Sequence, residues 1–173
     1  YVKGVVPYEM SGNWPLAALE AQAVCARTYA CRNSKHLGTY GFDVCSSTDC
    51  QVYNGVSLAT ARSDQAVENT AGLRLYYGGS LVQDAVYHAS NGGATEDAKN
   101  VWGTDKGYLK GKTDPYESKT SIPNYSWTVT YTAEELTWIL DQKLGRNERS
   151  IGSVQDVYIS AVTPAGNVSA VTF

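Results

Sequence analysis

The sequence predicts an α+β fold, on three observations. An alanine-rich stretch near the N-terminus has apolar residues at helical spacing, and pairs of strand-like segments flank glycine-containing turns. Helices and strands are mixed without the regular alternation of parallel α/β folds. The 173 residues, 43% of them hydrophobic, suffice for a buried core, so we expect a single domain over residues 1–173. In this domain a long N-terminal helix would pack on antiparallel β-hairpins, and a second helix would lie near the C-terminus.

The long helix is expected over residues 15–32, "PLAALEAQAVCARTYACR". Pro15 suits its first turn, where the missing N–H has no intrahelical partner. Val5, Val6 and Met10 predict a short preceding helical turn whose apolar side packs on this helix, with residues 11–13 as the break. Glu9 would therefore stand at a helix–helix corner.

The middle of the chain is expected to hold a loop, a short helix and a hairpin. Residues 33–55 are rich in Gly, Ser, Thr and Asp, which indicates a loop with short extended pieces. Residues 63–71 predict a helix closed by Gly72 in a left-handed conformation. Residues 73–77 and 81–87 flank Gly-Gly-Ser at 78–80, which predicts a hairpin.

The C-terminal third is expected to hold a strand, a capped helix and a closing hairpin. Residues 125–131 alternate as a strand. Thr132 and Glu135 form a capping box for a helix that runs to about Leu144 and stops at Gly145. Residues 154–173 predict a hairpin around Pro-Ala-Gly-Asn at 164–167.

Composition narrows the classes of partner. The formal net charge of -3 and the absence of clustered lysines argue against nucleic acid. No apolar run is long enough to cross a bilayer, so we expect no membrane segment in this chain. The chain starts at Tyr1 without methionine, and we expect that the N-terminal part of the native protein, with any signal or anchor, is missing.

Glu9 is the first residue that could carry chemistry. It follows two valines and a proline and precedes the only methionine, in "GVVPYEM". We expect Val5, Val6 and Met10 to form an apolar side around the carboxyl group, which would keep its proton near neutral pH and let it act as an acid. The alternative is a corner glutamate that caps a helix or pairs with Arg27.

Several blocks, taken together, identify a family. In chain order they are "YVKGVVPYEM", "WPLAALEAQAVCARTYA", "CSSTDCQVYNG", "YHASNGGATE", "VWG" and "DPYE". This arrangement resembles the SpoIID family of sporulation and cell-wall proteins, related to the amidase enhancer LytB, from Tyr1 to about Trp127. The resemblance implies a lytic transglycosylase that cleaves peptidoglycan glycan strands, preferably strands stripped of stem peptides.

In that family the catalytic acid is the glutamate of the "PxEM" block, which falls on Glu9. The acid protonates the glycosidic oxygen, and the resulting carboxylate takes a proton from the sugar's own 6-hydroxyl as it closes on C1, which leaves a 1,6-anhydro end. Catalysis of this kind needs no cofactor. The residues expected to line the glycan groove are Gln22, Arg27, Gln51, Tyr53, Tyr87, Ser90 and Asn91. Arg27 has a structural role as an equal alternative, because a close positive charge would oppose an acid. For Gly92 and Gly93 the alternatives are close approach to a glycan and a tight turn.

Two other functions remain open at this point. A binding module of the LytB type would grip glycan or stimulate a cell-wall amidase without turnover. A hydrolase would need a second carboxylate, about 5 Å from the first in a retaining enzyme and roughly 6.5–9.5 Å in an inverting one. The carboxylates that could serve are Asp84, Glu96, Asp97 and Asp114.

The cysteines allow two interpretations of the "CSSTDCQVY" block. Some members of the family bind zinc through "CxxTHCQVY"; here Asp49 replaces that histidine, and His36 is close enough in sequence to join Cys45 and Cys50 in a closed, structural set. The alternative is a disulfide between Cys45 and Cys50, or one that recruits Cys31, favoured in an extracytoplasmic protein. The resemblance also implies an extracytoplasmic location and a cell-wall amidase as a partner.

Overall fold

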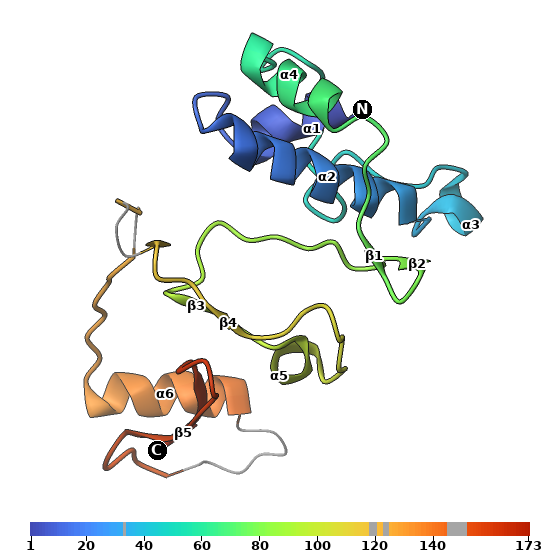
Figure 1. Cartoon of the computed structure of the whole chain (residues 1–173). Coiled ribbons are helices and arrows are strands. Elements are labelled where there is room, and N and C mark those ends of the chain that lie inside the picture. The colour runs from blue at the N-terminus through green and yellow to red at the C-terminus, as the bar shows by residue number, and fades with distance from the viewer. Residues whose placement is uncertain (33, 118–120, 123–124, 145–151) are drawn as a thin grey trace. The chain divides into compact units, whose positions relative to one another are not determined.

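The computed structural model describes residues 1–32, 34–117, 121–122, 125–144 and 152–173 (Figure 1). It confirms the α+β class, with helices and two-stranded antiparallel sheets in the described part of the chain. The chain divides into two compact units, Tyr1–Tyr87 and His88–Phe173, and each is described by itself. A single domain over residues 1–173 stays a prediction.

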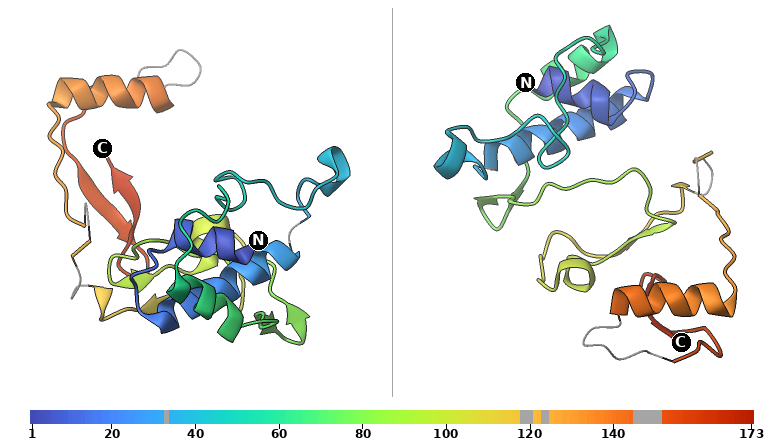
Figure 2. Two further views of the ribbon diagram at one scale, coloured as in Figure 1. Left: turned by 90° about the horizontal axis from the view of Figure 1, so that it is seen from above. Right: turned by 180° about the vertical axis from the view of Figure 1, so that it is seen from behind.

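Three helices build the core of the first unit. They are α1 (Val2–Glu9), α2 (Leu16–Arg32) and α4 (Ala61–Asn69), and Figures 1 and 2 show them side by side. Val6, Leu19, Ala23 and Ala66 are fully buried where they meet. The small alanine side chains let the helices approach closely, which explains the alanine-rich sequence of α2.

The expected packing of the long helix on β-hairpins is not confirmed. Among the described residues, α2 makes its main contacts with α1 and α4. The two helices predicted at the N-terminus are confirmed, since α2 matches the expected range and α1 extends the expected short turn to eight residues. Glu9 is the last residue of α1 and does not belong to the long helix.

The loop between α2 and α4 contains one short helix, α3 (Leu37–Tyr40). The rest of it, in its described part, has no regular secondary structure, as predicted. Gly4 of α1 lies where this loop packs closely against the helix. A Cβ at Gly4 would lie 2.3 Å from Cε2 of Tyr53 and 2.9 Å from the carbonyl oxygen of Gly55, so only glycine fits there.

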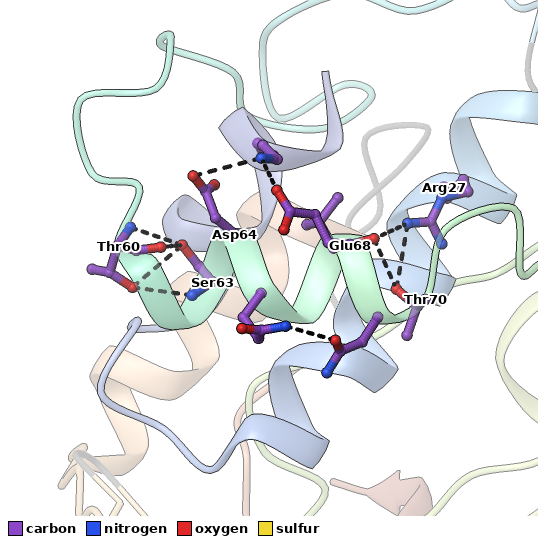
Figure 3. A network of polar contacts seen from close by, with 10 residues as sticks. Arg27, Thr60, Ser63, Asp64, Glu68 and Thr70 are labelled. Carbon is purple, nitrogen blue, oxygen red and sulfur yellow. Dashed lines mark hydrogen bonds and ion pairs between the residues drawn. The ribbon is translucent and has the colours of Figure 1, made fainter.

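The boundaries of α4 differ from the prediction at both ends. The helix begins two residues earlier because Thr60 is its N-cap, and Thr60 and Ser63 bond each other's backbone N–H groups in a capping box (Figure 3). Its C-cap is Thr70. Gly72 has the expected positive φ of 76°, but it lies in the turn that follows the cap.

The first hairpin is shorter than predicted. Strand β1 (Tyr76–Tyr77) pairs with β2 (Ser80–Leu81) across Gly78 and Gly79, both with positive φ. Residues 82–87 lie outside any strand. Val82 N–H still donates to Leu75 O across the hairpin, but the next backbone groups bond to α2: Leu75 N–H donates to Thr28 Oγ1, and Leu73 O accepts from Arg27.

The second unit contains two helices and two small sheets among its described residues. Strand β3 (Ala94–Thr95) pairs with β4 (Lys112–Thr113), with α5 (Ala98–Trp102) between them in sequence. Helix α6 (Ala133–Leu144) and the hairpin of β5 (Tyr158–Val162) and β6 (Val168–Thr172) follow.

The C-terminal predictions are confirmed in part. Thr132 and Glu135 form the predicted capping box of α6, with N–O distances of 2.8 and 3.2 Å. The predicted stop at Gly145 lies outside the described residues. The closing hairpin is present, although its strands begin only at Tyr158. The predicted strand at 125–131 is wrong, because these residues are exposed and pair with no strand in the described part of the chain.

Candidate functional site

Glu9 borders a pocket of about 250 Å³ within the first unit. The end of α1, helix α2, the loop before α4 and the segment after β2 each contribute to its wall. The lining residues are Glu9, Tyr29, Thr48, Cys50, Gln51, Val52, Ala85, Val86 and Tyr87. Of the sequence-predicted site residues, this pocket brings together Glu9, Cys50, Gln51 and Tyr87.

The surroundings of Glu9 differ from the expectation. We expected Val5, Val6 and Met10 to enclose the carboxyl group, but Val5 and Val6 are fully buried, and Val6 and Met10 pack in the helical core. Glu9 itself is exposed. The apolar part of the pocket wall comes from Val52, Ala85 and Val86 instead. The helix core uses the apolar residues of "GVVPYEM", and the carboxyl group faces solvent and pocket.

A chain of hydrogen bonds runs along the pocket beside Glu9. The Tyr1 hydroxyl donates to Gln51 Oε1 at 3.0 Å, and Gln51 Nε2 donates to the Tyr87 hydroxyl at 3.1 Å. Burial, with a further contribution from the Glu9 charge, raises the pKa of Tyr87 to about 12. Burial also raises the pKa of Tyr1 to about 12. Both tyrosines therefore keep their protons at neutral pH.

Tyr53, predicted to bind substrate, contacts Tyr1, the first residue of this series of hydrogen bonds. Its ring stacks on Tyr1 with centroids 5.5 Å apart and an interplanar angle of 17°. Its backbone N–H donates to Ser46 O. Tyr53 does not line the pocket, so within the first unit it supports Tyr1.

Two predicted residues on α2 lie outside the pocket lining. Gln22 is buried, and its Nε2 has no hydrogen-bond partner among the described residues. Arg27 donates to the carbonyl oxygens of Leu73 and Val67 and to Thr70 Oγ1, at 3.1, 3.2 and 3.4 Å. Figure 3 shows its side chain beside Thr70 at the C-terminal end of α4. The structural alternative for Arg27 therefore accounts for all of these contacts, because a cation satisfies carbonyl groups left free at a helix end.

Ser90 and Asn91 belong to the second unit, where they build a turn around Glu117. The Ser90 hydroxyl and the Asn91 N–H donate to the Glu117 carboxylate, which is only 8% exposed. The Asn91 side chain also donates to Asp114 and accepts from the Gly93 N–H. With Gly93 at φ 105°, these contacts fit the tight-turn alternative, and contact with a glycan stays a prediction.

The other carboxylates considered for catalysis have local partners in the second unit. Glu96 accepts hydrogen bonds from Asn167, Thr163 and Asn100, which lower its pKa to about 2. Asp97 caps α5 and pairs with Lys110. Asp114 accepts from Asn91 and from the Tyr116 N–H. Asp84 lies in the first unit but does not line the pocket. Glu9 is the one carboxylate among the residues that line the pocket.

The four residues predicted as a metal set lie together. The ligand atoms of His36, Cys45, Asp49 and Cys50 are all within 4.8 Å of one another. His36 precedes α3, and the other three come from the loop that follows it. His36 Nε2 is shielded from solvent and lies 3.1 Å from Asp49 Oδ2 without forming a hydrogen bond.

The chemistry of this set fits a tetrahedral zinc ion. Hydrogen bonds from Ser47 lower the pKa of Cys45 to about 6, toward the thiolate form that binds metal. A hydrogen bond from Lys35 lowers the pKa of Asp49. Two sulfurs, one nitrogen and one oxygen complete a four-ligand site. All four cysteines are free thiols in the structure.

Sequence reasoning missed several pocket residues. Tyr29 had a usable signal, because it lies in the same "AQAVCARTYA" block as two predicted site residues, Gln22 and Arg27. The apolar wall of Val52, Ala85 and Val86 had none, because these residues come together only through the path of the loop and of the segment after β2. Tyr1, which does not line the pocket but bonds to Gln51, had no signal either.

The helical unit that contains the pocket carboxylate and the Cys-His-Asp cluster matches a family of sporulation proteins. Residues 1–77 match the family SpoIID, described as stage II sporulation protein. By these residues, the chain belongs to the SpoIID family.

Individual relatives agree with this assignment. The amidase enhancer of Bacillus subtilis (strain 168) is 41% identical over 135 residues, which are 78% of this chain and 17% of that protein. Stage II sporulation protein D of the same organism is 34% identical over 160 residues, 84% of this chain and 45% of that protein. An uncharacterized protein of Brachyspira hyodysenteriae is 44% identical over 112 residues, 64% of this chain and 30% of that protein. The chain thus spans less than half the length of these relatives.

Proposed function

We propose that this chain is a lytic transglycosylase that cleaves peptidoglycan glycan strands, preferably strands without stem peptides, during cell-wall remodelling such as that of sporulation. The observation that carries the proposal is Glu9, an exposed carboxyl group and the one carboxylate among the residues that line the pocket. Membership in the SpoIID family supports the cell-wall substrate.

In the proposed mechanism Glu9 acts twice. As a neutral acid it gives its proton to the glycosidic oxygen, and the C1–O bond breaks while positive charge develops on the muramoyl ring. The Glu9 carboxylate then accepts the proton of the 6-hydroxyl, whose oxygen bonds to C1. The products are a new 4-hydroxyl end and a 1,6-anhydro end, and Glu9 is neutral again. Bound glycan would cover the exposed carboxyl and exclude water, a condition that favours its protonated form.

The pocket supports this route over hydrolysis. A hydrolase places a second carboxylate about 5 Å away in a retaining enzyme, or roughly 6.5–9.5 Å away in an inverting one. The lining residues other than Glu9 are neutral side chains and one cysteine. Glu96, Asp97 and Asp114 have local hydrogen-bond or ion-pair partners.

A second candidate function rests on one relative. Because an amidase enhancer is 41% identical over 78% of this chain, the chain is also a candidate module that binds glycan or a cell-wall amidase and stimulates that amidase without turnover. On either function we place the protein outside the cytoplasm, where peptidoglycan lies. Among the described residues no helix is long and apolar enough to cross a membrane.

We further propose that His36, Cys45, Asp49 and Cys50 hold a structural zinc ion. All four positions are then protein ligands, which leaves no open position for substrate. The ion would fix a loop that supplies four lining residues of the pocket, Thr48, Cys50, Gln51 and Val52. Catalysis by Glu9 requires no metal in this scheme.

Mass spectrometry of denuded glycan strands after incubation with the chain tests the proposed function. We expect fragments with 1,6-anhydro ends from the wild type and none from Glu9→Gln. Glu68→Gln is the matched control, because Glu68 is an exposed glutamate of the same unit whose contact is an ion pair with Lys3. Reducing ends would instead support hydrolysis, and intact strands that bind the chain would support the enhancer function.

A further inference from the structure

The hydrogen-bond chain beside Glu9 begins at Tyr1, a residue outside the predicted site. Tyr1 precedes α1 and Glu9 ends it, and Glu9 lines the pocket together with Gln51 and Tyr87. Gln51 lies between the two tyrosines, bonds to each of them and is only 2% exposed. A glutamine this buried, with both ends of its amide occupied, has little capacity left for contact with a sugar.

The directions of these hydrogen bonds follow from the group at the end of the series, the Glu9 carboxylate. A carboxylate can only accept, so Tyr87 can give its single proton to Glu9 as long as its other partner, Gln51, donates to the Tyr87 oxygen and does not compete for that proton. Gln51 Nε2 does so, and this orientation of the amide turns Oε1 toward Tyr1. The Tyr1 hydroxyl donates to that oxygen, so both ends of the amide are satisfied in this orientation.

We propose that Tyr1 and Gln51 are positioning residues that hold the Tyr87 hydroxyl as a hydrogen-bond donor to the carboxyl group of Glu9. This inference rests on the proposed function. Tyr87 keeps its proton throughout and donates to one oxygen of Glu9. The proton of the acid therefore sits on the other oxygen, where it faces the glycosidic bond. After proton transfer the same hydrogen bond stabilises the carboxylate until it accepts the proton of the 6-hydroxyl.

Three features support this assignment. The raised pKa of Tyr87, caused first by burial, keeps its hydroxyl protonated and able to donate. Stacking on Tyr53 fixes the ring of Tyr1. Gly4 leaves the space that the Tyr53 ring needs against α1. The loop and α1 thus hold Tyr1 in place, although Tyr1 does not itself line the pocket.

The test measures kcat and KM for denuded glycan strands with the whole chain. Tyr1→Phe keeps the stacked ring and removes only the hydroxyl, so we expect kcat to fall by about three- to tenfold, the effect of one neutral hydrogen bond, with KM unchanged. The thermal unfolding temperature should fall slightly, because the buried Gln51 Oε1 loses its donor, and kcat is therefore measured at a temperature at which both chains are folded. Tyr87→Phe should lower kcat by roughly ten- to a hundredfold, as expected for a donor to a charged group. The matched control is Tyr8→Phe. It removes a tyrosine hydroxyl of α1 that bonds to Asn54 and Ser57, and it should leave kcat unchanged.

A double variant separates positioning from general stabilisation. If Tyr1 acts through Tyr87, Tyr1→Phe should have no further effect on kcat in a Tyr87→Phe background. A Tyr1→Phe variant with wild-type kcat, or one whose loss is the same in both backgrounds, would overturn the inference while the proposed function stands. A wild-type chain that produces no anhydro ends would overturn the proposed function, and the positioning role with it.

Discussion

Arg27 shows how much one residue depends on its surroundings. Its place in the "AQAVCARTYA" block allowed either a contact with sugar or a structural role. The folded chain directs its guanidinium group to the end of α4, where it satisfies two carbonyl oxygens and one hydroxyl (Figure 3). Glu9 is the converse case, because its apolar sequence neighbours are buried in the core while its own carboxyl group is exposed.

We predict that Arg27→Met lowers the free energy of unfolding by about 1–2 kcal/mol, because carbonyl groups at the end of α4 lose their donor. KM for glycan should stay at the wild-type value, since Arg27 does not line the pocket. Chemical denaturation and steady-state kinetics measure the two quantities. Arg32→Met, an exposed arginine on the same helix, serves as the control. A raised KM with an unchanged free energy of unfolding would instead support a contact between Arg27 and the glycan.

At the scale of elements, the helices followed the prediction more closely than the strands. Pro15, the alanine-rich face and the capping box of Thr132 and Glu135 are local signals, and α2 and α6 begin where these signals place them. A strand needs a partner that local sequence does not specify. The segment at 125–131 has no such partner among the described residues, and the backbone next to the short first hairpin bonds to α2.

The loop before α4 is the element for which a metal matters most. We predict that the purified chain contains one zinc ion per molecule and four thiols that react after denaturation, and that chelation lowers its thermal unfolding temperature. Atomic absorption, thiol titration and calorimetry measure these quantities. Asp49→Asn should weaken zinc binding, and Asp43→Asn, an exposed aspartate of the same loop, should not. A chain without zinc and with two thiols fewer would establish a disulfide instead.

At the scale of the whole molecule, the two units have different sources of stability. The first unit rests on a small helical core. In the second, Glu96 joins distant parts of the chain, because its carboxylate accepts from Asn100 in α5 and from Thr163 and Asn167 at the turn of the closing hairpin.

This arrangement predicts a dependence of stability on pH. The hydrogen bonds lower the pKa of Glu96 from 4.5 to about 2, so their stabilisation is fully present above pH 4.5 and is lost as the pH falls toward 2. We therefore expect Glu96→Gln to unfold at a lower temperature than the wild type at pH 6, and this difference to shrink between pH 4.5 and 2. Tryptophan fluorescence reports mainly this unit, which contains Trp102, Trp127 and Trp138 of the four tryptophans.

Glu134→Gln is the control for this measurement, because Glu134 is an exposed glutamate at the start of α6. Its unfolding temperature should follow that of the wild type at every pH. A Glu96→Gln difference that stays constant from pH 6 to pH 2 would contradict the role given to the Glu96 carboxylate.

The sequence by itself determined the α+β class, the main helices and the family, because helix signals are local and family motifs are read in chain order, and it singled out Glu9 as the candidate acid. It also named the four residues, His36, Cys45, Asp49 and Cys50, that the structure brings together as the proposed zinc site. Only the tertiary structure decided that Glu9 is exposed, that Arg27 supports α4, and that Tyr1 reaches Tyr87 through Gln51. These facts depend on contacts between residues about 36–50 positions apart, and such contacts follow from how loops and helices pack rather than from any local pattern.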